Sequence, residues 1–318
     1  MEPNLQNGGG DKPSQPSEQV RRLIERLAFQ ANRTSKSPSS DAVHDLRVAM
    51  RRSDRALVAF KVHLPRKPAK RIRKQLKSVL SSAGAVRDYD IAAGILSKMD
   101  RPGAAALHRD VRARRKTAEK SLLLRLKRLS LRTRVSKWCD DLNLDAPQPD
   151  FQPQMLGTMA RNTMPRLARS FFDAGDLAAA RGSAERLHDF RILAKKFRYT
   201  LELFAPGYGP VAEEWMRNIR SVQSVLGTIN DYRTVLTMAE RAGSSPKLLA
   251  ALKRSERRKI REFRQLWSER FTRPEAARWI RALRAGGEGT LRERRIPRKP
   301  VASSTTAVAI GKAAAARA

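Results

Sequence analysis

Two segments of the chain combine a histidine with cations at helical spacing. One begins at His44 and reads HDLRVAMRRSDRALVAF, and the other begins at His188 and reads HDFRILAKKFRYTLELF. On a helix with 100° per residue, each segment puts cations on the side of its histidine and apolar side chains on the opposite side. The cations of the histidine's side are Arg47, Arg51, Arg55, Arg191, Lys195 and Arg198. Such cations suit charge-assisted hydrogen bonds to phosphate oxygens, so the pattern predicts binding of a polyanion.

The clustering of these charges distinguishes the two segments from ordinary basic helices. Like charges three or four residues apart cost roughly 0.2–0.5 kcal/mol per pair, which favours spreading them around a helix. A solvated face neutralised by acidic neighbours is the alternative interpretation. Each histidine could instead satisfy a backbone group, but beside bound phosphates its charged form would be favoured and it would act as a donor.

The next helix after each segment extends the cationic surface. Its basic residues are Lys70, Arg71, Lys74 and Lys77 in the first half, and Arg217 and Arg220 in the second. Lys74 and Lys77 correspond to Arg217 and Arg220 at a separation of 143 residues. Residues three apart share a helix face, so each half could present a cationic wall made from two helices.

A glycine and an aspartate follow in both halves: Gly84 and Asp88, then Gly227 and Asp231. We expect each glycine to end one helix and each aspartate to cap the next, because these residue types are favoured at helix ends. The alternative is that Asp88 and Asp231 orient a basic side chain.

The correspondence between the halves indicates an internal duplication. The histidine segments are 144 residues apart, and KSVLSSAGAVRDY from Lys77 matches RSVQSVLGTINDY from Arg220 at 143. Two blocks in the same order at nearly one separation predict two similar helical bundles related by a pseudo-two-fold axis.

Composition limits the class of protein. The chain has 318 residues, 41% of them hydrophobic, and a formal net charge of +35. It can therefore bury a core, and its field attracts polyanions such as nucleic acid, anionic lipid or a phosphate polymer. One cysteine and four scattered histidines predict neither a disulfide nor a metal site. No apolar run has the length of a membrane span, and the N-terminus has no signal segment, so we expect a cytoplasmic protein.

The elements that must position the cations are helices, because apolar residues recur every three to four positions and strand-like alternation is scarce. The sequence predicts an all-α chain with helices over 18–32, 40–62, 67–82, 88–99, 103–130, 153–172, 183–204, 210–226, 231–242, 246–270 and 274–285. Disordered tails are expected over 1–16 and 286–318. The segment 141–153 is the expected linker between halves of about 17–140 and 154–285.

The two histidine helices, each followed by the Gly-x-x-(Arg/Asn)-Asp segment, resemble the CHAD domain, the conserved-histidine α-helical domain, over residues 17–285. The resemblance implies two pseudo-symmetric bundles around a basic central cavity, binding of inorganic polyphosphate, and localisation at polyphosphate granules. It implies His44 and His188 as the family's histidines, with basic site residues at Arg47, Arg51, Arg52, Arg191, Lys195, Lys196 and Arg198. Asp54 stands where the second copy has Arg198, which makes the first half the less regular one.

No catalytic signature accompanies the resemblance. The chain contains no Glu-x-Glu-x-Lys segment, Walker A loop or G-x-S-x-G turn, so we expect neither catalysis nor a cofactor. A nucleic-acid-binding protein is the alternative function, although Phe60, Phe190, Phe197 and Phe204 lie on the apolar arcs, away from the cations that a stacked base would approach. A scaffold on anionic membranes is a third possibility, but its apolar arcs belong to a core.

Overall fold

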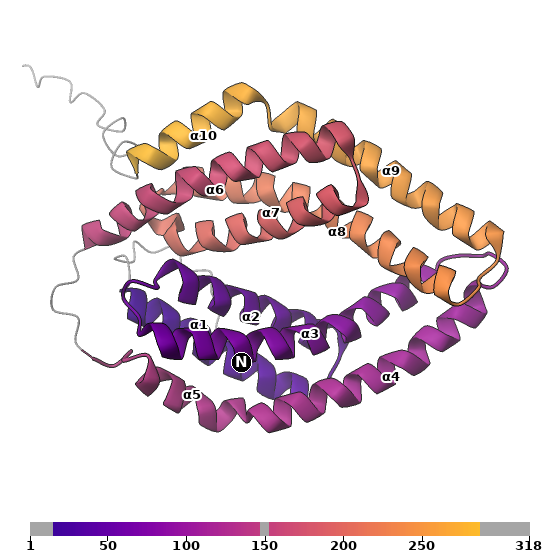
Figure 1. Cartoon of the computed structure of the whole chain (residues 1–318), viewed down its shortest axis with the longest axis horizontal. Helices are drawn as coiled ribbons and strands as arrows, with labels where there is room; N and C mark the ends of the chain where they lie inside the picture. The colour runs from indigo at the N-terminus through magenta and orange to yellow at the C-terminus, as the bar shows by residue number, and fades with distance from the viewer. Residues whose placement is uncertain (1–14, 147–152, 287–318) are drawn as a thin grey trace, which may run out of the picture.

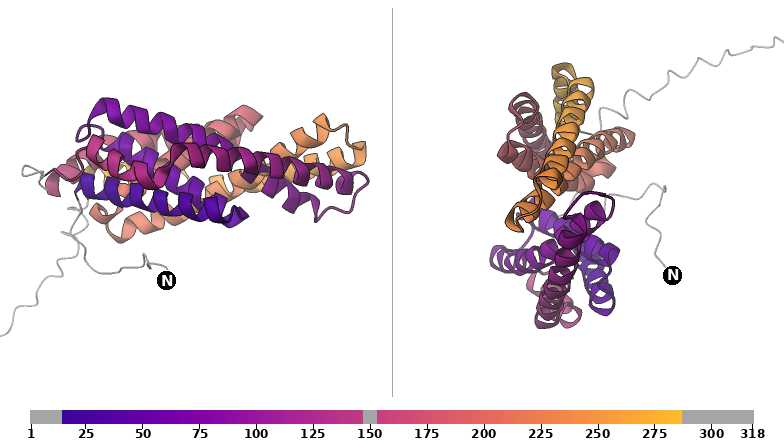
Figure 2. Two further views of the ribbon diagram at one scale, coloured as in Figure 1. Left: turned by 90° about the horizontal axis from the view of Figure 1, so that it is seen from below. Right: turned by 90° about the vertical axis from the view of Figure 1, so that its right-hand side faces the viewer.

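The computed structural model describes residues 15–146 and 153–286, and every regular element in these two ranges is a helix. The predicted all-α fold class is therefore confirmed. Figure 1 shows the helices of the N-terminal half below those of the C-terminal half. In the end-on view of Figure 2 the halves are two groups of helices that meet along one side.

Within residues 15–146 and 153–286, each half contains five α-helices. The N-terminal half consists of α1 (Pro16–Lys36), α2 (Ser40–Ala59), α3 (Arg66–Leu96), α4 (Ala104–Leu129) and α5 (Leu131–Asp141). The C-terminal half consists of α6 (Pro153–Arg181), α7 (Ala184–Phe204), α8 (Pro210–Arg241), α9 (Pro246–Arg270) and α10 (Arg273–Ala285), with a 3₁₀ turn at Ala205–Gly207.

The histidine helices and their successors form the contact between the halves. Helix α2 packs against α7, and α3 packs against α8. The rings of Phe60 and Phe204, which are 144 residues apart in the sequence, meet edge to face with centroids 6.0 Å apart. Residues at matched positions of the two segments thus touch each other across the interface, although the duplication itself stays a prediction from the sequence.

Serine caps start both histidine helices. The hydroxyl of Ser39 accepts a hydrogen bond from the backbone N–H of Ala42, and that of Ser183 accepts one from Arg186. A side-chain acceptor at this position satisfies a backbone donor that the first turn leaves free. Each cap lies five residues before the histidine, so the two helices begin in the same register.

Aromatic side chains fill the core of the C-terminal half. Phe171 of α6 contacts Phe190 and Phe197 of α7 at centroid distances of 5.2 and 5.1 Å. Trp267 of α9 lies so close to α6 that a Cβ on Gly175 would be 2.0 Å from its ring. Glycine at this position therefore allows α6 and α9 to approach each other.

A second, smaller core lies where the α3–α4 hairpin meets the α8–α9 hairpin, at the right-hand end of Figure 1. It includes Leu96, Leu107, Val235 and Leu248, all nearly or fully buried. A hydrogen bond from the Ser245 hydroxyl to the Pro102 carbonyl, 2.6 Å long, also joins the two hairpins. The halves are thus in contact at this end as well as along α2 and α7.

Two of the predicted helix ends are wrong. Helix α3 continues through Gly84 and Asp88, and α8 continues through Gly227 and Asp231. Both glycines have ordinary helical backbone and neither aspartate caps a helix. One long helix replaces two predicted ones in each half, because packing on both neighbouring helices outweighs the roughly 1 kcal/mol that an interior glycine costs.

The predicted helix over 103–130 corresponds to α4, which ends where Ser130 adopts a left-handed backbone (φ 44°). Helix α5, which the sequence did not predict, follows immediately. Residues 1–14 and 287–318 of the expected tails, and 147–152 of the expected linker, lie outside the described residues. Among the helices of the described part, none is both long and apolar enough to cross a bilayer.

Candidate functional site

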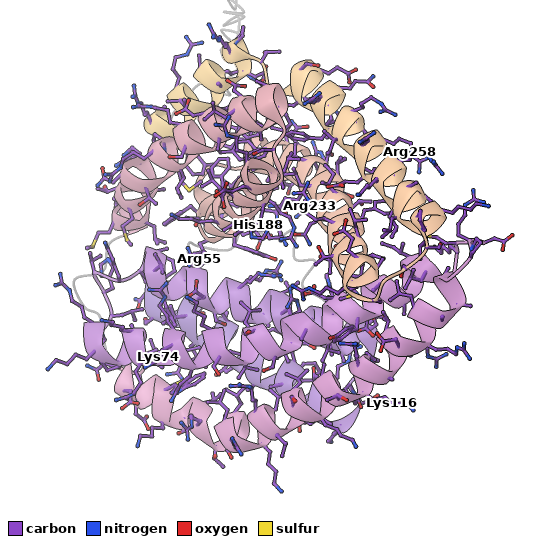
Figure 3. The ribbon with its side chains drawn as sticks, turned by 45° about the vertical axis from the view of Figure 1, so that its right-hand side comes forward. Arg55, Lys74, Lys116, His188, Arg233 and Arg258 are labelled. Atoms are coloured by element: carbon purple, nitrogen blue, oxygen red, sulfur yellow. The ribbon has the colours of Figure 1, made fainter. Side chains whose placement is uncertain are left out.

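A cleft with a volume of about 790 Å³ lies between the two halves and is lined by α2, α3 and α7. We call it the basic cleft. Nine of its lining residues are cations: Arg51, Arg55, Lys70, Arg73, Lys74, Lys77, Arg191, Lys195 and Lys196. Its one lining carboxylate is Asp54. Figure 3 shows Arg55 where the two halves meet and Lys74 on the N-terminal half.

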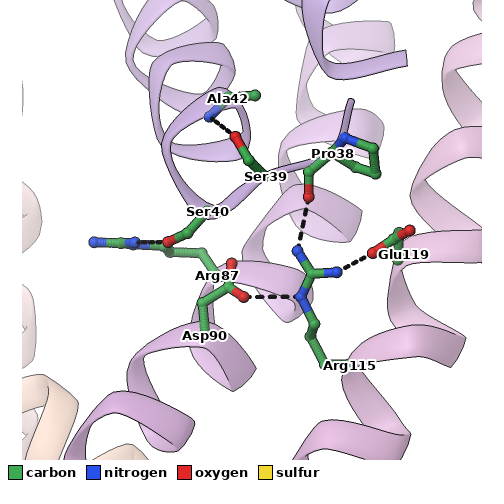
Figure 4. Close-up of polar contacts among 8 residues, drawn as sticks. All are labelled: Pro38, Ser39, Ser40, Ala42, Arg87, Asp90, Arg115 and Glu119. Atoms are coloured by element: carbon green, nitrogen blue, oxygen red, sulfur yellow. Dashed lines mark hydrogen bonds and ion pairs between the residues drawn. The ribbon is translucent and has the colours of Figure 1, made fainter. Parts of the chain in front are cut away.

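The wall formed by α2 is held at its N-terminal end by a polar network (Figure 4). Arg115 of α4 donates to Asp90 of α3 at 2.8 Å and to the Pro38 carbonyl before α2 at 2.7 Å. Arg87 of α3 donates to the Ser40 hydroxyl at 2.7 Å. These bonds join α4 and α3 to the start of α2 and so fix the helix that carries Arg47 and Arg51.

Cations from both halves lie close enough together, in and beside the basic cleft, to repel one another. Lys195 is largely buried, and this burial, together with repulsion from Arg191, Arg51 and Arg47, lowers its pKa to about 6. Burial, followed by repulsion from Arg51, lowers the pKa of Arg47 to about 10. Lys195 is therefore mostly neutral at pH 7 until an anion enters, whereas the guanidinium groups remain charged.

Asp88 and Asp231 lie beside these cations. Burial raises the pKa of both carboxyl groups, and Arg47 and Arg191 partly oppose that rise at Asp88. At Asp231 the opposition comes from Arg191, Arg87 and Lys195. Neither aspartate has an ion pair within 4 Å among the described residues. Of the two interpretations from the sequence, capping is wrong, and electrostatic influence on the basic side chains is what the arrangement favours.

One buried donor in the site has no acceptor. The Nε atom of Arg191 is buried and makes no hydrogen bond with any part of the protein that the structure describes. Leaving a buried donor unpaired costs about 1–3 kcal/mol, and more for a charged group. An anion in the basic cleft would supply the missing acceptor.

Asp54 organises the rim on the N-terminal side. Its carboxylate accepts hydrogen bonds from Arg55 and, at 2.8 Å, from Arg73. Burial raises the pKa of Asp54, but these two arginines outweigh it and hold the pKa below its ordinary value. The aspartate that departs from the repeat thus fixes two cations in place and reduces the charge of the rim.

Two predicted site residues are engaged by Glu202 of α7. Arg198 pairs with Glu202, donates to Gln223 of α8 at 2.8 Å, and lies over the Tyr199 ring. Arg52 of α2 donates to the same carboxylate at 3.0 Å. Glu202 therefore links the halves, and both arginines have a structural partner.

The remaining predicted residues lie around the basic cleft rather than in its lining. Arg47 lies near Arg51, whose charge repels it, and donates to the Leu80 carbonyl at 3.3 Å. His44 is on the surface near Arg87, and partial desolvation followed by repulsion from Arg87 lowers its pKa. His188 lines a separate depression of about 320 Å³ with Arg233, and Figure 3 shows both. Arg217 and Arg220 are exposed on α8.

Eight cations that the sequence singled out line the cleft together: Arg51, Arg55, Lys70, Lys74, Lys77, Arg191, Lys195 and Lys196. Sequence reasoning left Arg73 out, although it lies three residues after Lys70 and four before Lys77 and so shares their face. It also left out Glu202, whose position four residues after Arg198 was the available signal. The phenylalanines at 60, 190, 197 and 204 are buried, and Tyr199 is the one aromatic residue in the lining.

The described residues contain no group of three or more His, Cys, Asp or Glu side chains placed to hold a metal ion. The charged side chains that line the basic cleft are arginine and lysine donors together with Asp54. Such a surface can bind and neutralise a flexible polyanion through many contacts.

Comparison with known proteins identifies relatives of this arrangement. The family model for the CHAD domain matches residues 18–240. The crystal structure of the CHAD domain from the plant Ricinus communis superposes with a TM-score of 0.58 and 21% identity, over 86% of this chain and 93% of that chain. PptA from Streptomyces chartreusis gives a TM-score of 0.58 and 18% identity, over 81% of this chain and 99% of that chain. At these identities the two structures show a shared fold. The comparison with curated proteins finds no match.

Proposed function

The chain belongs to the CHAD domain family, and we propose that it binds inorganic polyphosphate, without catalysis, in the basic cleft between its halves. The observation that carries the proposal is the charge of the lining, nine cations with one carboxylate. A linear phosphate chain offers one charge after another and no other chemistry. It matches a surface whose polar groups are almost all cationic donors.

The buried cations support the same ligand. Arg191 carries an unpaired buried donor, and burial, followed by repulsion from neighbouring arginines, lowers the pKa of Lys195. Both features are unfavourable in the free protein and are relieved by a bound anion. Because a bound anion removes both unfavourable features, their removal contributes to the free energy of binding.

Nucleic acid is the competing polyanion. Its recognition in single strands depends on aromatic side chains that stack with bases. The four phenylalanines of the histidine helices are buried, and Tyr199 is 4% exposed and covered by Arg198. The lining therefore offers donors for phosphates without a platform for bases, which favours polyphosphate.

The test is competition among long-chain polyphosphate, duplex DNA and single-stranded RNA for the full chain, at equal phosphate concentration and fixed ionic strength. We expect polyphosphate to displace both nucleic acids at physiological salt, and its affinity to fall steeply as salt is raised. Equal affinities for the three polymers would contradict the proposal and favour a general nucleic-acid binder. We also expect the protein to associate with polyphosphate granules, as the family resemblance implies.

A further inference from the structure

A second cationic pocket lies at the end of the molecule where the hairpins meet. Its volume is about 660 Å³, and we call it the tip pocket. Its cations are Lys98 and Arg101 from the α3–α4 turn, and Arg254, Arg257, Arg258 and Arg261 from α9. One carboxylate, Asp100, lines it as well. Figure 3 shows Arg258 on α9, at the edge of the molecule.

The cations of the tip pocket are available for a ligand. All six are exposed, and none has an ion pair with any described residue. Other cations of α9 do have such partners, since Lys253 pairs with Glu240 and Lys259 with Glu262. Glu240 of α8 and Glu262 of α9 therefore pair with cations that do not line the tip pocket, and its arginines have no ion pair among the described residues.

The backbone of the tip pocket is fixed by contacts between the halves. The turn that carries Lys98 and Arg101 is held by the hydrogen bond from Ser245 to the Pro102 carbonyl. Directly beneath it, Leu96 of α3 and Leu248 and Leu252 of α9 are buried in the small core. The charges of the turn and those of α9 thus lie on rigid elements that face one opening.

The tip pocket is separate from the basic cleft. The two share no lining residue. Along α3, Leu80 lines the cleft and Leu96 ends the helix next to the pocket. A helix rises about 1.5 Å per residue, so these two positions are about 24 Å apart. The α9 arginines also lie beyond residues 18–240, which the family model matches.

We propose that the tip pocket is a second binding site for a phosphate chain, and that one long polyphosphate molecule occupies both sites at once. The inference builds on the proposed function and adds a preference for long chains. A chain bound in the basic cleft is held near the tip pocket at high effective concentration, so the second contact increases affinity without a second encounter. Tripolyphosphate is too short to connect sites this far apart and binds each one independently.

The experiment is calorimetric titration of the full chain with tripolyphosphate and, separately, with long-chain polyphosphate. R254Q/R258Q removes two charges from the tip pocket, and R51Q/R191Q removes two from the basic cleft. The control R128Q/R169Q removes two exposed charges that line neither site. A second tip variant, R257Q/R261Q, covers the case in which the first fails to fold.

We expect two tripolyphosphate sites in the wild type and the control, and one in each tip variant and in the cleft variant. Long-chain polyphosphate should lose at least tenfold in affinity in the tip variants, since linkage of two sites contributes a factor on the order of 10² to 10⁴. One tripolyphosphate site in the wild type, or equal long-chain affinity in tip and control variants, would overturn the inference and leave the proposed function intact. A cleft variant that keeps both sites would contradict the proposed function instead.

Discussion

The guanidinium group of Arg47 lies directly against Gly84, so that a Cβ built on this glycine would be 2.8 Å from Nη1. Arg47 comes from α2 and Gly84 from the middle of α3. The missing side chain therefore makes room for a cation that contacts Leu80, one of the residues that line the basic cleft. At the matching position in α8, a Cβ on Gly227 would meet nothing within 4 Å.

The two glycines make a matched pair of variants. Gly84→Ala should move the Arg47 guanidinium and weaken polyphosphate binding several-fold, whereas Gly227→Ala should leave binding unchanged. Both substitutions remove an interior glycine, which favours the helix by up to about 1 kcal/mol. Affinities measured by titration, with thermal denaturation as the folding control, check this prediction. Equal affinities in the two variants would show that the position of Arg47 does not matter.

Replacement of Arg198 is expected to affect stability, whereas replacement of Arg51 is expected to affect polyphosphate binding. Arg198→Ala removes hydrogen bonds to Glu202 and Gln223 and should lower the free energy of unfolding by about 1.5–3 kcal/mol. Arg51→Ala removes a cleft cation without an ion-pair partner among the described residues, so it should weaken binding and leave stability nearly unchanged. Urea denaturation and polyphosphate titration of both variants separate the two roles. A loss of affinity without loss of stability in Arg198→Ala would return this residue to the binding surface.

We predict that Lys195 takes up a proton when polyphosphate binds. Burial and neighbouring arginines lower its pKa to about 6, and a bound polyanion raises it again. At pH 8 binding should therefore take up close to one proton, and affinity should fall by up to about tenfold per pH unit as the pH rises above 6. Titration in buffers of different ionisation enthalpy measures this uptake.

Lys195→Met is the control for that measurement, because methionine does not titrate. The same pKa fixes the effect on stability. Between pH 6 and the ordinary lysine pKa of 10.5 the unfolded chain binds a proton that the folded chain does not, so this group makes the free energy of unfolding rise with pH. If Lys195→Met retains the full proton uptake on polyphosphate binding, Lys195 is not the group that takes up the proton.

Gly175→Ala should lower the stability of the protein, a result that helix propensity alone would not suggest. An alanine there would place its Cβ 2.0 Å from the Trp267 ring, and overpacking of this kind costs about 1–3 kcal/mol. Gly94→Ala in α3, where nothing lies within 4 Å, should instead raise stability slightly. Denaturation midpoints of the two variants test the prediction. Equal midpoints would mean that α6 and α9 separate at little cost.

The parts of the fold that depend on local sequence were predictable. Ser39 and Ser183 start α2 and α7 five residues before the histidines, and the periodicity that follows defines the buried and cationic sides. The helix ends predicted at Gly84 and Gly227 were wrong. Glycine often ends a helix when only local sequence is considered, whereas packing against neighbouring helices continues α3 and α8 through these two positions. That competition depends on contacts between segments distant in sequence.

The site was predictable only in part for the same reason. Arg51 and Lys195 are on the histidine's side of their helices and line the cleft. Arg52 and Arg198 have equally suitable positions, but Glu202 engages both. Which cations remain free is decided by the acidic residues that the fold brings beside them, and spacing along one helix does not contain that information.

The central claim is that position in the basic cleft, rather than total charge, determines binding. Its most direct test compares polyphosphate affinity in R51Q/R191Q and R128Q/R169Q, two variants with the same net charge and with helicity verified. Each charge-assisted hydrogen bond contributes about 1.5–3 kcal/mol before screening, so the cleft variant should bind at least tenfold more weakly than the control. Equal affinities would contradict the account, since they would make the cleft one more solvated basic surface.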